Sequence, residues 1–205
     1  MSKTLTIPRV GSFSDLDAFA RGRVDTVCWP AEFPYCPEVR FAVAHDGRAL
    51  LIRFDVVEDH LRAAALENNG PVWEDSCVEF FVKEPDSPYY FNFETNCIGV
   101  GLAARRLSRT ECTHFDDARM AQVIRRSSLP MQPMDLRERK AWWLELEIPF
   151  SLISERPGVP ERLLANFYKC GDKTDVPHFL SWNPVEVPAP DFHRPDFFGE
   201  LILKP

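Results

Sequence analysis

The clearest alternation of apolar and polar residues lies in two neighbouring runs near the first quarter of the chain. Residues 39–44 read VRFAVA and residues 52–56 read IRFDV, so an apolar side chain recurs at every second position. Asp46-Gly47 lies between them, a pair that favours a tight turn. The pattern predicts an antiparallel β-hairpin, because only a strand places every second side chain on one face.

A second pair of runs covers residues 76–82 and 89–96, and the intervening segment KEPDSP is rich in turn-forming residues. We expect these runs to be antiparallel neighbours. Alternation places Glu79 on the face of its strand that Cys77 and Phe81 share. On the next strand one face is apolar, and the other carries four polar side chains: Tyr90, Asn92, Glu94 and Asn96.

The rest of the chain continues the pattern of short strands separated by Pro, Asp and Asn. Further predicted strands cover residues 120–126, 142–148, 163–170, 178–182 and 199–203, and the only predicted helices are residues 59–68 and one turn at 150–154. The sequence therefore predicts an all-β, antiparallel β-sandwich or jelly roll with one or two short helices. Residues 1–205 are expected to form a single domain, since no repeat or linker composition divides them.

Composition removes several classes of function. The chain has 18 Pro and 9 Gly, and its net charge is −7. An acidic chain without a basic cluster is a poor ligand for nucleic acid or an anionic membrane, so neither is expected as a partner. No stretch approaches the roughly 20 apolar residues that span a bilayer. The amino terminus has no apolar leader, which predicts a cytoplasmic location, or a secreted or periplasmic one if a leader was removed.

Cysteine and histidine usage indicates no metal site. The six cysteines form neither a C-x-x-C pair nor a zinc spacing, and the five histidines are scattered singly. Free, largely buried thiols are the favoured interpretation, with a disulfide between Cys28 and Cys36 as the alternative. No nucleotide-binding or hydrolase motif occurs, so no cofactor is expected.

Glu79 and Glu94 are the natural pair of carboxylates for an enzyme. Glycoside hydrolysis needs two carboxyl groups on either side of the scissile bond, roughly 5 to 9 Å apart. The alternative interpretation is that this polar face is simply solvated.

Two tryptophans stand at the ends of predicted strands. Trp73 precedes the Glu79 strand in PVWEDS, and Trp182 lies in LSWNP. Indole rings stack on the apolar faces of sugars, while carboxylate and amide groups bind the hydroxyl rim. Either tryptophan could instead be a lid on the core. Alternation assigns Trp142 to the core, and Trp29 is expected to pack over one end of the sandwich.

Five segments together resemble the family 9 carbohydrate-binding modules: residues 72–81, 90–99, 166–172, 177–182 and 191–199. The resemblance implies an immunoglobulin-like β-sandwich that binds saccharides without cleaving them and prefers the reducing ends of plant polysaccharides such as xylan. It also implies a mono- or oligosaccharide ligand and an association with glycoside hydrolases. Calcium sites occur in such modules; no calcium-binding loop is traceable here, so calcium stays open as a ligand without assigned residues.

The resemblance assigns roles to individual residues. Trp73 and Trp182 match the two tryptophans that sandwich a sugar ring, and Glu79 matches the glutamate that binds its hydroxyls. Arg105 or Arg106 is similar to the family's arginine if an insertion is allowed. Phe179 stands where the family has an asparagine, so the chain departs here from the polar rim that carries the reducing-end preference, with His178 and Asn183 as the nearest polar residues.

The leading hypothesis is a non-catalytic carbohydrate-binding domain. Trp73 and Trp182 would stack on the sugar, Glu79 would accept hydrogen bonds, and the rim would be completed by Asn96, Arg106 or His178. Two rivals remain. One is a glycoside hydrolase of carbohydrate catabolism that uses Glu79 with Glu94 or Glu74, and the other is a β-sandwich interaction domain that has lost sugar binding. His193 is interpreted as a histidine of the core or of a corner, with its hydrogen bonds made within the protein, in preference to a ligand-binding residue.

Overall fold

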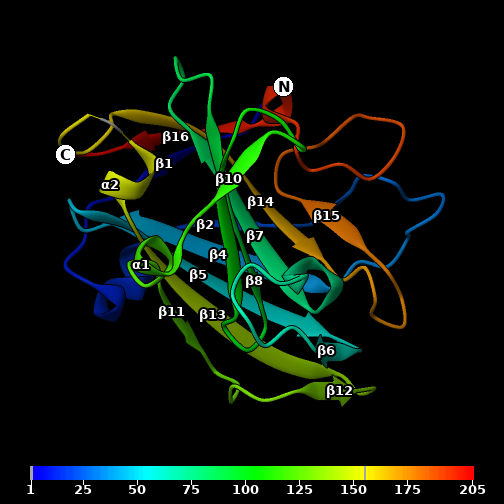
Figure 1. The fold of residues 1–205 in the computed structure, drawn as a ribbon. Coiled ribbons are helices and arrows are strands. Elements are labelled where there is room, and N and C mark those ends of the chain that lie inside the picture. The colour runs from blue at the N-terminus through cyan, green and yellow to red at the C-terminus, as the bar shows by residue number, and fades with distance from the viewer. Residues whose placement is uncertain (1, 155) are drawn as a thin grey trace.

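A computed structural model describes residues 2–154 and 156–205, and these residues form two packed β-sheets (Figure 1). In Figure 1, strands β7 and β8 lie in front of β4 and β5 and cross them. The larger sheet has nine strands: β1 (Thr4–Ile7), β16 (Gly199–Leu203), β14 (Arg162–Cys170), β7 (Cys77–Lys83), β8 (Tyr90–Asn96), β9 (Gly101–Arg106), β10 (Cys112–His114), and at the side β15 (Phe179–Ser181) and β3 (Thr26–Val27).

The second sheet has five strands, and a separate two-stranded ribbon lies beside it. The order in the five-stranded sheet is β11 (Ile124–Ser127), β13 (Lys140–Pro149), β5 (Ala49–Glu58), β4 (Glu38–His45) and β2 (Ala20–Arg23). The ribbon pairs β12 (Met134–Leu136) with β6 (Leu61–Ala63). The helices are short: η1 (Phe13–Ala18), η2 (Val72–Glu74), α1 (Asp117–Met120), α2 (Phe150–Ile153) and η3 (Pro195–Phe197). The predicted β-sandwich is confirmed.

Both predicted hairpins are present with the predicted facing. In the β4–β5 hairpin Phe41 lies opposite Phe54, and in the β7–β8 hairpin Phe80 lies opposite Phe93. Phe167 on β14 joins the layers, because its ring stacks on Phe41 at 3.8 Å between centroids and lies 5.0 Å from Phe80. One face of each sheet therefore forms a common aromatic core.

A charged pair also lies inside this core. Lys169 on β14 and Glu58 on β5 are fully buried, and their Nζ and Oε2 atoms are 2.9 Å apart. The other carboxylate oxygen of Glu58 accepts a 2.7 Å hydrogen bond from Trp142 Nε1. Lys169 Nζ also lies 2.8 Å from His178 Nε2 and donates to the carbonyl of Cys170. The two sheets are thus joined by polar as well as apolar contacts.

Two secondary-structure predictions were wrong in part. Residues 59–68 are not a helix, although they are rich in Ala and Leu. Leu61–Ala63 form β6, which pairs with β12, and Asp75 accepts backbone hydrogen bonds from Ala64 and Ala65 directly after this strand. Residues 120–126 hold the end of α1 and the start of β11 in place of one strand. The turn predicted at 150–154 is confirmed as α2.

The structure also shows the state of the cysteines and the character of the helices. All six thiols are free, and Cys77, Cys97 and Cys170 are buried, so the alternative disulfide between Cys28 and Cys36 is not formed. In the described parts of the chain, no helix is both long and apolar enough to cross a membrane.

We expect Lys169→Met and Glu58→Gln each to destabilise the fold by about 3–5 kcal/mol, because each leaves one buried charge without its partner. The double variant should lose less than the sum of the two single losses, since it removes both charges. Urea denaturation of the four proteins measures this coupling. Strictly additive losses would show that the ion pair contributes nothing to the contact between the sheets.

Candidate functional site

The outer face of the nine-stranded sheet carries a row of polar side chains. Glu79 on β7 lies directly opposite Glu94 on β8. Arg106 Nε on β9 donates a 2.7 Å hydrogen bond to Asn92 Oδ1, and Asn92 Nδ2 donates a 2.8 Å hydrogen bond to Glu94 Oε1. The predicted sharing of one face is confirmed for these strands, and it produces a chain of hydrogen bonds from a guanidinium to a carboxyl group.

This polar face is covered by loops and is not solvated. Only 3% of Glu79 and 4% of Glu94 is exposed. Burial raises the pKa of Glu94 to about 7, against the lowering effects of the Asn92 hydrogen bond and of Arg106. Burial, followed by the neighbouring Glu94, raises the pKa of Glu79 well above its ordinary value. Raised pKa values favour the protonated form of a carboxyl group, which can donate as well as accept hydrogen bonds.

A cavity of about 310 Å³ opens above the two carboxyl groups. Its walls combine aromatic, acidic and basic side chains from strands and loops far apart in the sequence: Trp73, Glu79, Glu94, Arg106, Arg109, Cys170, Asp172, Phe179, Pro190, Asp191, Phe192 and His193. A volume of this size is at the lower end of the range for small-molecule sites.

Trp73 forms one aromatic wall of the cavity. It lies in the helical turn η2, and 37% of its surface is exposed. The carbonyl of Trp73 accepts a 3.2 Å hydrogen bond from the backbone N–H of Asp172, which ties the turn to the end of β14. The indole is therefore held in place while its surface stays accessible.

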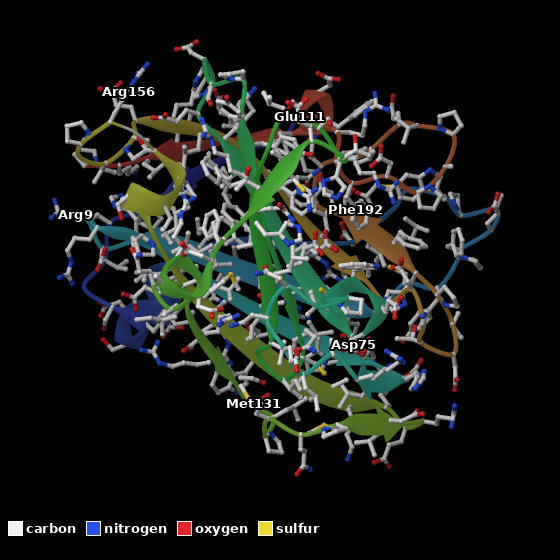
Figure 2. All side chains as sticks on the ribbon, in the orientation of Figure 1. Arg9, Asp75, Glu111, Met131, Arg156 and Phe192 are labelled. Carbon is white, nitrogen blue, oxygen red and sulfur yellow. The ribbon has the colours of Figure 1, made fainter. Side chains whose placement is uncertain are left out.

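Phe192 and Phe179 form the other aromatic part of the lining. Phe192 stacks on Tyr168 of β14, with centroids 4.2 Å apart and planes at 15°, and its centroid lies 6.1 Å from that of Phe179. In Figure 2 the labelled Phe192 lies close to β14 and β15. Phe179 thus adds an apolar surface to the cavity.

Trp182 is not part of the cavity, which corrects the expectation that it stacks on the sugar. Only 5% of its surface is exposed, and its ring packs edge-on against Phe41 and Phe167 in the core between the sheets. Gly199 passes so close that an added Cβ would lie 2.4 Å from the indole. Of the two interpretations that the sequence left open, a lid on the core is the one observed.

Two further candidates lie outside the cavity lining. Asn96 is buried and donates to the carboxylate of Asp75 and to the carbonyl of Ala65, so it supports the turn before β7. His178 faces Lys169 and Val176, and burial followed by the Lys169 charge lowers its pKa well below the ordinary value. Both are corrections, since these side chains were expected at the sugar rim.

Arg106 does line the cavity, whereas Arg105 does not. The Arg105 guanidinium lies 3.5 Å from the ring centroid of Tyr89 on the opposite face of the sheet. Glu74 is turned away as well and pairs with Lys173 at 2.9 Å.

Sequence reasoning missed the loop residues that complete the walls. Arg109, Asp172 and Asp191 lie in irregular segments, where no periodicity indicates which side chains turn inward. Burial raises the pKa of Asp172 to about 6. His193 lines the cavity with its Nδ1 atom 3.0 Å from the hydroxyl of Tyr90, and burial lowers its pKa to about 3, so the ring is neutral. The only signals were the resemblances of residues 166–172 and 191–199 to a known family.

The family can be decided by comparison with known proteins. Residues 11–203 match a family model described as "Carbohydrate-binding family 9". The chain belongs to carbohydrate-binding family 9. The match includes every strand except β1 and every element that lines the cavity, so the expected resemblance is confirmed. None of the curated proteins with which the chain was compared matches it.

Solved structures agree with this family 9 assignment. A carbohydrate-binding protein candidate from Bacteroides uniformis ATCC 8492 shares 35% identity at a TM-score of 0.93, with all of both chains covered. Two structures of a family 9 module from Caldicellulosiruptor kristjanssonii share 14% identity and hence show similarity of fold. The complex with cellotriose has a TM-score of 0.64 (98% of this chain and 94% of that one), and the complex with glucose has 0.63 (98% and 96%).

The different surroundings of the two tryptophans can be tested by stability. We expect Trp182→Ala to lower the free energy of unfolding by about 3–5 kcal/mol, because it opens a large hole in the core. Trp73→Ala should lower it by no more than about 1 kcal/mol, since that ring is partly exposed. Denaturant titration of both variants gives the comparison, and equal losses would contradict the placement of Trp182.

Proposed function

We propose that this family 9 domain binds the sugar ring of a neutral saccharide in the cavity next to Trp73, without cleaving it. The observation that carries the proposal is the combination, in one cavity, of an exposed tryptophan and the buried pair Glu79 and Glu94. A pyranose presents apolar C–H faces and a rim of hydroxyl groups, and it needs both kinds of surface at once.

The polar groups suit hydroxyls because they can both donate and accept hydrogen bonds. Arg106 and Arg109 are donors only, whereas Glu79, Glu94 and Asp172 have raised pKa values and can take either part. Acidic and basic groups face the same space, which favours a neutral ligand over an ion. Phe192 offers a second apolar surface in place of Trp182.

The positions of Glu79 and Glu94 argue against hydrolysis. The two residues face each other across neighbouring strands and lie on one wall of the cavity. A glycosidase places its carboxyl groups on either side of the scissile bond, with the sugar between them. Here a bound sugar would lie above both groups, so binding without cleavage is the function we favour.

The class of ligand is proposed by analogy within the family. Relatives of this fold bind cellotriose and glucose. We therefore propose a glucan-type or xylan-type oligosaccharide, bound at a chain end because the cavity holds little more than one ring. Association with glycoside hydrolases that act on the same polymer would follow from this activity.

Trp73→Ala should weaken the binding of glucose and cellotriose at least about tenfold, a change of about 1.4 kcal/mol, because it removes the apolar wall. Isothermal titration calorimetry with glucose, cellotriose and xylotriose measures the affinity. Trp143→Ala is the matched control, since Trp143 lies on the five-stranded sheet outside the cavity. Unchanged affinity in Trp73→Ala would overturn the proposed site.

Chromogenic glucosides and xylosides should not be turned over by the wild-type protein or by Glu79→Gln, because neither geometry supports a two-carboxylate reaction. Release of chromophore is followed by absorbance over hours. Turnover by the wild type that Glu79→Gln abolishes would show that the domain is a hydrolase.

A further inference from the structure

Two buried cysteines lie beside Glu79: Cys170 lines the cavity with it, and Cys77 lies behind them. Cys77 and Glu79 are two residues apart on β7 and therefore share a face, and Cys170 on β14 lies directly opposite Cys77. The two Sγ atoms and a carboxylate oxygen of Glu79 all lie within 4.8 Å of one another. Among the residues that the structure describes, this is the one group of three His, Cys, Asp or Glu side chains so arranged.

The contacts of these groups differ from those of thiols that only fill space. Cys170 Sγ donates a 3.0 Å hydrogen bond to Glu79 Oε1, so a carboxyl group and a thiol already meet at this point. All three residues are at most 3% exposed. Free buried cysteines ordinarily pack among apolar groups, whereas both of these thiols lie beside a carboxyl group.

The spacing fits a tetrahedral ion. Zinc bonds of about 2.3 Å to sulfur and about 2.1 Å to oxygen place the ligand atoms about 3.6–3.8 Å apart. The three atoms observed need only a small inward movement of their side chains to reach these distances. Because the ligands come from paired strands inside a sheet, their backbone positions are fixed in advance.

We propose that Cys77, Glu79 and Cys170 form a binding site for Zn²⁺. Two thiolates and one carboxylate suit zinc, whereas Ca²⁺ and Mg²⁺ prefer oxygen ligands alone. Each zinc–sulfur bond replaces a sulfur–hydrogen bond, and the protons leave to the solvent.

The fourth coordination position would face the cavity. Glu79 and Cys170 line the cavity, while Cys77 is fully buried behind them. Three protein ligands with one open position leave room for a water molecule or for another oxygen ligand from the cavity. The site carries one net negative charge when zinc is bound, and Arg106 in the cavity wall compensates it in part. Zinc binding does not depend on the proposed sugar binding.

The experiment uses the full chain, reduced and stripped of metal with a chelator. Cys36→Ser/Cys112→Ser serves as the background, because these two thiols are exposed and could bind metal unspecifically. Zn²⁺ is titrated by calorimetry and Co²⁺ by its thiolate charge-transfer and tetrahedral absorption bands. We expect one ion per chain in the wild type and in this background.

Cys77→Ser and Cys170→Ser, each in that background, should weaken the metal affinity at least about a hundredfold and abolish the charge-transfer bands. Cys97→Ser is the matched control, a buried thiol outside the group, and should bind as the background does. Glu79→Gln keeps both thiols and the shape of the site. Zn²⁺ should raise the unfolding temperature of the background but raise that of Glu79→Gln far less.

Three results would overturn the proposal: no stoichiometric ion in the background, unchanged binding after loss of Cys77 and Cys170, or equal stabilisation of Glu79→Gln by Zn²⁺. Sugar affinity is measured separately with chelator present. A protein that binds sugar but no metal refutes only the zinc site, and one that binds metal but no sugar refutes only the proposed function.

Discussion

The central strands β7, β8 and β14 are buried on both faces, so every polar side chain on them must find a partner inside the protein. An unpaired buried polar group costs about 1–3 kcal/mol, which few domains can tolerate repeatedly. On the outer face Arg106, Asn92 and Glu94 satisfy one another in a chain of hydrogen bonds. On the inner face Lys169 is paired with Glu58. The inner face is occupied by the core and this ion pair, so the cavity lies on the outer face.

The neighbouring residues of β14 show how one strand serves both faces. Lys169 points between the sheets to Glu58, while Tyr168 and Cys170 point to the outer face beneath Phe192 and Glu79. A shift of one residue in the pairing of β14 with β7 would exchange these side chains between core and cavity. The ion pair, the aromatic stack and the cavity therefore depend on the same register.

The sequence predicted the features that follow from period-two alternation. It predicted that Glu79 shares a strand face with Cys77, that Glu94 shares one with Asn92, and where both central hairpins lie. These relations depend only on residues that are close together in the sequence. It could not predict that loops 107–111, 171–178 and 186–198 cover that face, since irregular segments carry no periodicity. Trp182 illustrates the limit: a tryptophan beside a proline at a strand end looks exposed, yet Gly199 leaves room for it in the core.

The covering loops also determine the electrostatic character of the cavity. If the outer face were open to solvent, Glu79 and Glu94 would both ionise at neutral pH and repel each other at cross-strand distance. Burial instead raises both pKa values, so the pair keeps proton donors available beside Arg106. Under the proposed function, a cavity with nearly balanced charge and protons to donate would select ligands by their hydroxyl pattern and not by their charge. The acidic composition of the chain thus has different expected consequences in two places: exposed carboxylates disfavour polyanionic ligands, and the buried ones are the proposed partners of a neutral ligand.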